Sequence, residues 1–192
     1  DLQGLFYNMS RCYQINGELP LVDLQEAFNK VVQNNEILRT VFKVEDDKFW
    51  QIILEKIDTK VICIKDDKND IRELVKNLKR PFDLQNGPLV RLYYIENQQK
   101  KYVFIEMHHI ISDMTTFELF VNQVFSLCNR KEVTNSTIQY KDFSEWSNQK
   151  DDLVARKYWI EKLEDYPRNV ELISDYPRKK IRDMHGNSLE WW

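Results

Sequence analysis

The segment Met107-His108-His109-Ile110-Ile111-Ser112-Asp113-Met114 places two adjacent histidines where the sequence pattern changes from strand to helix. Residues 101–106 before it alternate and are rich in aromatic side chains, which is typical of a strand. Residues 115–130 after it carry apolar side chains at helical spacing. Because imidazole is the side chain best suited to moving protons near neutral pH, this junction is the candidate site for chemistry.

The same residues also have structural explanations. A pair of histidines is more often structural than catalytic, and Asp113 is suited to cap the helix that follows it. Histidine and aspartate are both metal ligands, but adjacent residues on a strand point to opposite faces and do not easily share one ion. We therefore expect no metal site here.

Composition excludes several classes of function. The chain has 192 residues, of which 42% are hydrophobic, and a net charge of -3. Acidic and basic residues are interspersed, so no basic field is present to hold nucleic acid, and no apolar run has the length of a membrane span. The three cysteines, Cys12, Cys63 and Cys128, are odd in number and widely spaced, which indicates a reducing, cytoplasmic compartment.

Periodicity predicts a mixture of helices and strands. Helices are expected over residues 2–10, 23–35, 69–78, 115–130, 140–146 and 152–163, the second with Asp23 as cap and the third with Asn69. Extended segments are expected over residues 11–17, 36–42 and 61–64, with hairpins over 40–54 and 89–108. The fold class is therefore α/β (α+β), with a mixed, mostly antiparallel sheet flanked by helices.

Six segments, taken in order, resemble the N-terminal half of the condensation domain of nonribosomal peptide synthetases, which belongs to the chloramphenicol acetyltransferase-like superfamily. The signature His-His-x-x-x-Asp-Gly of that family is similar to residues 108–113. The other five segments are residues 36–42, 81–91, 140–146, 158–163 and 175–178. Each match is weak alone, but six in the family's order across nearly the whole chain are specific.

This resemblance implies that residues 1–192 are the N-terminal lobe of a condensation domain, a piece of a larger protein without its C-terminal lobe. The intact family domain forms an amide bond between a donor acyl or peptidyl thioester and an acceptor aminoacyl thioester, in the biosynthesis of antibiotics and other secondary metabolites. The substrates arrive on phosphopantetheine arms of donor and acceptor carrier proteins, next to an adenylation domain. The resemblance implies no cofactor bound by the lobe itself, and an isolated lobe that is inactive.

The resemblance also assigns roles to single residues. His109 corresponds to the catalytic histidine, as a general base or as a group that orients the amine and stabilises the developing charge. His108 supports the fold or the wall of the site. Asp113 is expected to pair with Arg39, so that a carboxylate–guanidinium bridge holds the loop that presents His109.

Three departures from the family pattern are visible. Met114 stands where the family has glycine, and a side chain there disfavours a positive φ. Asn34 and Asn35 replace an Arg-His pair, and the family's first motif is only partly present around residues 3–5. Two alternatives therefore stay open: a non-catalytic or docking condensation-like module, and the lobe of an epimerisation domain.

Overall fold

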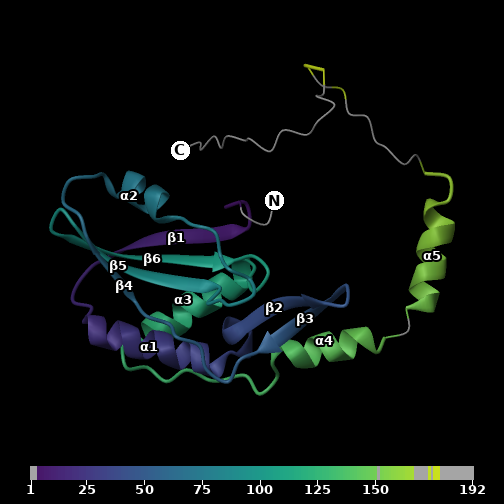
Figure 1. Cartoon of the computed structure of the whole chain (residues 1–192), viewed down its shortest axis with the longest axis horizontal. Coiled ribbons are helices and arrows are strands. Elements are labelled where there is room, and N and C mark those ends of the chain that lie inside the picture. Colours follow the sequence, from purple (N-terminus) through teal and green to yellow (C-terminus); the bar gives the residue numbers. More distant parts are fainter. Residues whose placement is uncertain (1–3, 151, 167–172, 174, 178–192) are drawn as a thin grey trace. The chain divides into compact units, whose positions relative to one another are not determined.

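The computed structural model describes residues 4–150, 152–166, 173 and 175–177 (Figure 1). The chain divides into two compact units, residues 1–149 and residues 150–192. The elements of the first unit are β1 (Asn8–Ile15), α1 (Leu21–Asn34), a 3₁₀ helix (Glu36–Arg39), β2 (Thr40–Glu45), β3 (Lys48–Ile53), β4 (Ile62–Lys65), α2 (Ile71–Leu78), β5 (Val90–Asn97), β6 (Lys100–His108), α3 (Met114–Cys128) and α4 (Tyr140–Asn148). The second unit contains α5 (Leu153–Leu163), whose side chains are exposed.

A four-stranded sheet with the order β1-β6-β5-β4 forms the centre of the first unit. The β1–β6 and β6–β5 pairs are antiparallel, whereas β5 and β4 run parallel. The β2–β3 hairpin is a separate two-stranded sheet. The predicted fold class, a mixed and mostly antiparallel sheet with helices, is confirmed.

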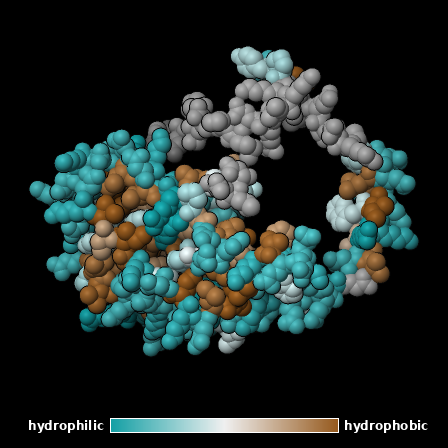
Figure 2. All heavy atoms as spheres, viewed as in Figure 1, coloured by the Kyte–Doolittle hydropathy of each residue, from teal (hydrophilic) through white to brown (hydrophobic). Residues whose placement is uncertain are grey.

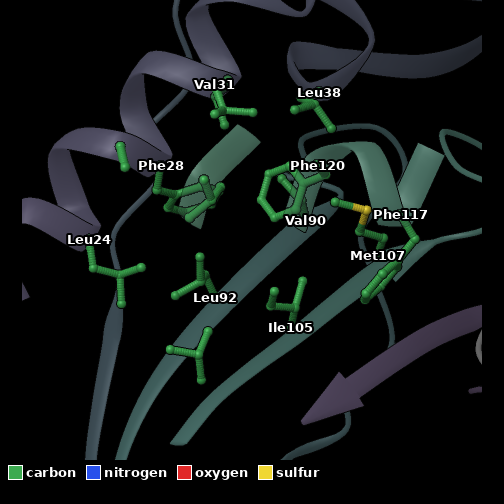
Figure 3. Packing of buried hydrophobic residues seen from close by; sticks show 14 of the residues in the cluster. Leu24, Phe28, Val31, Leu38, Val90, Leu92, Ile105, Met107, Phe117 and Phe120 are labelled. Carbon is green, nitrogen blue, oxygen red and sulfur yellow. The ribbon is translucent and has the colours of Figure 1, made fainter. Parts of the chain in front are cut away.

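Helices cover both faces of the four-stranded sheet, with α1 and α3 on one side and α2 on the other (Figure 1). Successive strand residues point to opposite faces, so β5 and β6 divide their apolar side chains between two cores. The larger core packs Val90, Leu92, Val103, Ile105 and Met107 against α1 and α3. Figure 3 shows Phe28 of α1 and Phe120 of α3 above these strands, and their rings meet edge to face at 6.0 Å.

The smaller core lies on the α2 face and contains Leu74, Tyr93, Ile95, Tyr102 and Phe104. Glu106 and His108 follow Phe104 on this same face of β6 by the alternation of the strand. The face therefore changes from apolar to polar toward the end of β6, which brings charged groups to the edge of the smaller core.

The helix predicted over residues 2–10 is wrong where the structure describes it. Residues 8–10 belong to β1, in which Asn8 pairs with His108 and Ser10 with Glu106. Backbone pairing with β6 overrides the weak local helical preference of this segment. The pairing matters for the site, because it brings the start of β1 to the two histidines.

Three smaller predictions about element ends are also corrected. Residues 36–39, expected to be extended, form a 3₁₀ turn that buries Leu38. Helix α1 begins at Leu21, so Asp23 lies in its first turn rather than at its cap. The N-cap of α2 is Asp70, whose side chain accepts a hydrogen bond from the Arg72 amide, while Asn69 bonds the Asp66 carboxylate.

Candidate active site

The end of β6 holds the backbone of both histidines in fixed positions. The His108 amide donates to the Leu89 carbonyl at 3.0 Å, and the His109 amide donates to the Tyr7 carbonyl at 2.8 Å. The Ile111 amide then donates a hydrogen bond to the His108 carbonyl at 3.1 Å, which closes a turn. The two histidines are thus fixed between residues that precede β5 and β1.

The His108 side chain is used within this turn. Its Nδ1 accepts a hydrogen bond from the Ile110 amide at 3.0 Å, so Nδ1 carries no proton and the proton of the neutral ring lies on Nε2. The rings of Phe82 and Tyr7 lie 6.1 and 6.0 Å from the His108 ring. Burial, and secondarily the nearby His109, lowers the pKa of His108 below its ordinary value of 6.5.

The His109 side chain is exposed, one residue beyond the end of β6. Within the described part of the chain, no hydrogen bond or ion pair engages its imidazole. Both ring nitrogens are therefore available to a ligand, whereas Nδ1 of His108 is already occupied by the Ile110 amide. Of the two adjacent histidines, the geometry separates one that bonds its own turn from one that faces outward.

Asp113 lies at the N-cap of α3. Its Oδ1 accepts a hydrogen bond from the Thr116 amide at 2.7 Å, and this bond lowers the pKa of the carboxyl group. Met114 is the first residue of α3, and its φ is not positive. The glycine of the family pattern is therefore not required for the backbone conformation found at this position.

The predicted pair between Arg39 and Asp113 is not formed in this structure. Arg39 donates to the Leu54 carbonyl at 2.5 Å and lies 3.7 Å from the Glu36 carboxylate. The 3₁₀ turn explains this, because it places Glu36 and Arg39 three residues apart on one short helix, within reach of each other. Arg39 therefore joins the turn to the segment after β3, and Asp113 caps α3.

Sequence reasoning missed a charged group beneath the two histidines. Glu106 lies two residues before His108 on β6 and is fully buried. Its Oε2 lies 3.6 Å from Arg91 Nη1 and accepts a hydrogen bond from the Tyr93 hydroxyl at 3.3 Å. Burial raises the pKa of Glu106, and Arg91 opposes this rise. The available signal was a lone acid inside an apolar strand, Tyr102-Val103-Phe104-Ile105-Glu106-Met107.

A hollow of about 630 Å³ adjoins the turn. It is lined on one side by the β2–β3 hairpin, on another by residues 82–85, and at the turn by Ile110. This volume is within the range of small-molecule sites. Figure 2 shows apolar patches separated by hydrophilic residues on the viewed face of the molecule.

The described residues contain no cluster of three or more histidine, cysteine, aspartate or glutamate side chains that would hold a metal ion. None of the helices in that part of the chain has the length and apolar character to cross a membrane. All three cysteines are free thiols.

Comparisons with known proteins place this geometry in a family. The profile of the condensation domain matches residues 2–191. The chain is 30% identical to bacitracin synthase 3 of Bacillus licheniformis over 97% of its own length, and 31% identical to surfactin synthase subunit 2 of Bacillus subtilis (strain 168) over 100%. It spans only 3% and 6% of these two relatives.

Solved structures agree on the fold. The epimerization domain from the third module of tyrocidine synthetase B has a TM-score of 0.76 at 18% identity, over 90% of this chain and 43% of that one. The starter condensation domain of rhizomide synthetase has a TM-score of 0.71 at 18% identity, over 86% of this chain and 44% of that one. These likenesses show that the chain has the fold of one lobe of such domains. The chain belongs to the condensation-domain family, as its sequence motifs indicated.

Proposed function

We propose that this chain is the N-terminal lobe of a condensation domain that joins two carrier-bound substrates through an amide bond. The amine of the acceptor aminoacyl thioester attacks the carbonyl carbon of the donor thioester. The new C–N bond forms, the C–S bond breaks, and the donor carrier's thiol leaves with a proton. Family membership and the end of β6 support this proposal.

The observation that carries the proposal is the difference between the two histidines. His108 Nδ1 already accepts the Ile110 amide, whereas the exposed His109 has no partner within the described residues. An attacking amine must lose a proton while negative charge builds on the carbonyl oxygen. In this proposal His109 takes that proton, or orients the amine and stabilises the charge through a hydrogen bond.

The proposed substrates are tethered to phosphopantetheine arms of a donor and an acceptor carrier protein, and an adenylation domain loads such carriers. The names of the bacitracin and surfactin synthases support a peptide-forming assembly. The hollow beside Ile110 has room for part of an acyl group. Three free cysteines support a reducing compartment, the cytoplasm.

The test uses the intact protein that carries this lobe together with its second lobe. Donor and acceptor carriers are loaded, and the amide product is followed by mass spectrometry. His109→Ala is expected to lower the condensation rate by about 10²- to 10⁴-fold, the usual contribution of positioned proton transfer. Lys101→Ala, at the other end of β6, is the control and keeps the rate. An unchanged rate in His109→Ala rejects the catalytic assignment.

The fold likeness to an epimerization domain gives a second candidate. A single carrier loaded with an L-aminoacyl group in deuterated water separates the two reactions, because epimerisation exchanges the α-hydrogen without forming an amide. A non-catalytic docking module would give neither product. The isolated 192-residue chain is expected to be inactive in both assays, since the second lobe is proposed to complete the site.

A further inference from the structure

Beneath the two histidines lies a buried ion pair that the proposed reaction does not use. Glu106 is 0% exposed and the Arg91 side chain is 12% exposed. One carboxylate oxygen, Oε2, faces both Arg91 and the Tyr93 hydroxyl. The other oxygen, Oε1, is buried without a hydrogen bond of normal geometry, although the nearby Asn8 side chain helps to lower the pKa of this carboxyl group. A stability role alone explains this poorly, because a buried pair with an unsatisfied oxygen is seldom more stable than apolar residues of the same size.

Arg91 extends this pair into the loop before β5. Its Nη1 donates to the Arg80 carbonyl at 2.7 Å and its Nη2 donates to the Pro81 carbonyl at 2.6 Å. Its Cζ lies 3.9 Å from the centre of the Phe82 ring. One guanidinium group therefore fixes three consecutive residues, two through their backbone and one through its ring. A lysine would keep the charge but lose the planar fork that makes these contacts together.

Phe82 carries the contact on to the candidate site. Its ring is perpendicular to that of His108, at 88° and 6.1 Å between centroids. His108 Nδ1 in turn accepts a hydrogen bond from the Ile110 amide, and this bond closes a loop that contains His109. The contacts thus run from Glu106 through Arg91 and Phe82 to the turn that presents His109.

We infer that Arg91, held by Glu106, is a positioning residue: through Phe82 it fixes the His108 ring, and so the orientation of the His109 turn. This inference rests on the proposed catalytic role of His109. The hydrogen bonds, ion pair and ring contact of Arg91 are with Glu106 and with residues 80–82, so its effect on the His109 turn passes through the Phe82 ring. Loss of Arg91 leaves the His109 imidazole itself unchanged and alters the position of that imidazole.

The central variants are Arg91→Lys and Phe82→Leu, each with a conservative partner. Phe82→Tyr keeps an aromatic face for both Arg91 and His108, and Glu106→Gln keeps the shape of the side chain that holds Arg91. Leu74→Ala is the control, since Leu74 is buried in the smaller core, on the face of β6 that carries Glu106, without contributing to this series of contacts. It reports what destabilisation of the α2 face does by itself.

Two readouts are needed. The first is kcat and KM for amide formation by the intact protein, where Arg91→Lys and Phe82→Leu are expected to lower kcat about 10- to 100-fold with little change in KM, the range for a small misplacement of a catalytic group. Phe82→Tyr restores kcat and Leu74→Ala leaves it unchanged. The second is the ¹⁵N spectrum of the His108 imidazole in the 192-residue chain, where Arg91→Lys and Phe82→Leu shift the Nδ1 signal and Leu74→Ala does not.

The outcomes are distinguishable. If His109→Ala abolishes condensation but Arg91→Lys and Phe82→Leu keep wild-type kcat, the positioning inference is wrong and the proposed function stands. If His109→Ala is fully active, the proposed function fails. In either case an unmoved Nδ1 signal in both central variants overturns the proposed coupling of Arg91 to the turn through Phe82. If Arg91→Lys does not fold, Phe82→Leu supplies the same comparisons.

Discussion

At the scale of single residues, Asp113 shows how one carboxylate fixes the start of α3. Its hydrogen bond to the Thr116 amide replaces a partner that the first turn of a helix lacks. We expect Asp113→Ala to lower the unfolding temperature by about 2 to 4 °C, the shift that loss of an N-cap gives in a chain of this length. Asp113→Asn also caps helices and should restore most of that loss in calorimetry.

Asp113→Ala and Asp113→Asn also test whether Arg39 pairs with Asp113. Since Arg39 bonds Leu54 and Glu36 instead, the effects of Asp113→Ala and Arg39→Ala should add in the double variant. If the effects in the double variant are strongly non-additive, and Asp113→Asn is as damaging as Asp113→Ala, the result would support the ion pair between Arg39 and Asp113 that the family resemblance implies.

His108 makes the stability of the chain depend on pH. Its pKa is lowered in the folded protein, so the unfolded chain binds the proton more readily. Stability is therefore complete above the unfolded pKa of 6.5 and falls as the pH drops toward the lowered folded value. Urea unfolding between about pH 7 and pH 5 should show this loss.

His108→Gln is the comparison, because it removes the titration while keeping a side chain that accepts a hydrogen bond. The loss of stability between these pH values should be smaller in this variant. Glu106 has the opposite sign, since its raised pKa makes the folded state bind the proton more readily as the pH falls. The difference between wild type and His108→Gln isolates the histidine, and identical pH profiles would mean that His108 is not buried as described.

At the scale of elements, the loop before β5 depends on Gly87. Its φ is +65°, and a Cβ there would lie 3.0 Å from Ile57 Cδ1 and 3.2 Å from Val41 Cγ1. Gly17 also has a positive φ, of +108°, but a Cβ there would meet nothing within 4 Å. Both alanine variants carry backbone strain, and only Gly87→Ala adds tight contacts, with the side chains of Ile57 and Val41.

We expect Gly87→Ala to lower the free energy of unfolding by about 1 to 3 kcal/mol more than Gly17→Ala, the usual cost of overpacking. Denaturant titration of the two variants measures the difference. Equal losses would show that the loop moves aside and that only the backbone conformation matters.

Most helices and strands could be predicted from the sequence, because their apolar residues recur at regular spacing. The β5–β6 hairpin, α2 and α3 follow from residues that alternate or recur at helical spacing. The start of β1 could not be predicted in this way, since residues 8–10 are extended only through their pairing with β6. The same limit applies to the candidate site: the His108–Asp113 spacing identified the turn, whereas the partners of Arg39 and Arg91 depend on tertiary contacts that no local pattern encodes.

At the scale of the whole molecule, both hydrophobic cores lie within the first unit. Their buried members fall between Leu19 and Val124, and no described residue of the second unit is among them. The buried ion pair and the histidine turn lie within the same span. The described contacts that hold the His109 turn are therefore made by residues of the first unit, and a complete catalytic site is proposed to need a second lobe.

This arrangement predicts that a chain ending at Gln149 unfolds with the same free energy as the 192-residue chain, within about 0.5 kcal/mol. A chain ending at Cys128 is the contrast, because it loses α4 and the segment before it. There the Gln139 side chain accepts a hydrogen bond from the Glu36 amide at 3.0 Å, and Lys141 pairs with the Glu36 carboxylate at 2.8 Å. Removing these partners exposes the turn that bears Arg39, so the shorter chain should unfold at lower urea. If ending the chain at Gln149 is as damaging as ending it at Cys128, residues 150–192 stabilise the first unit and the two units are not independent.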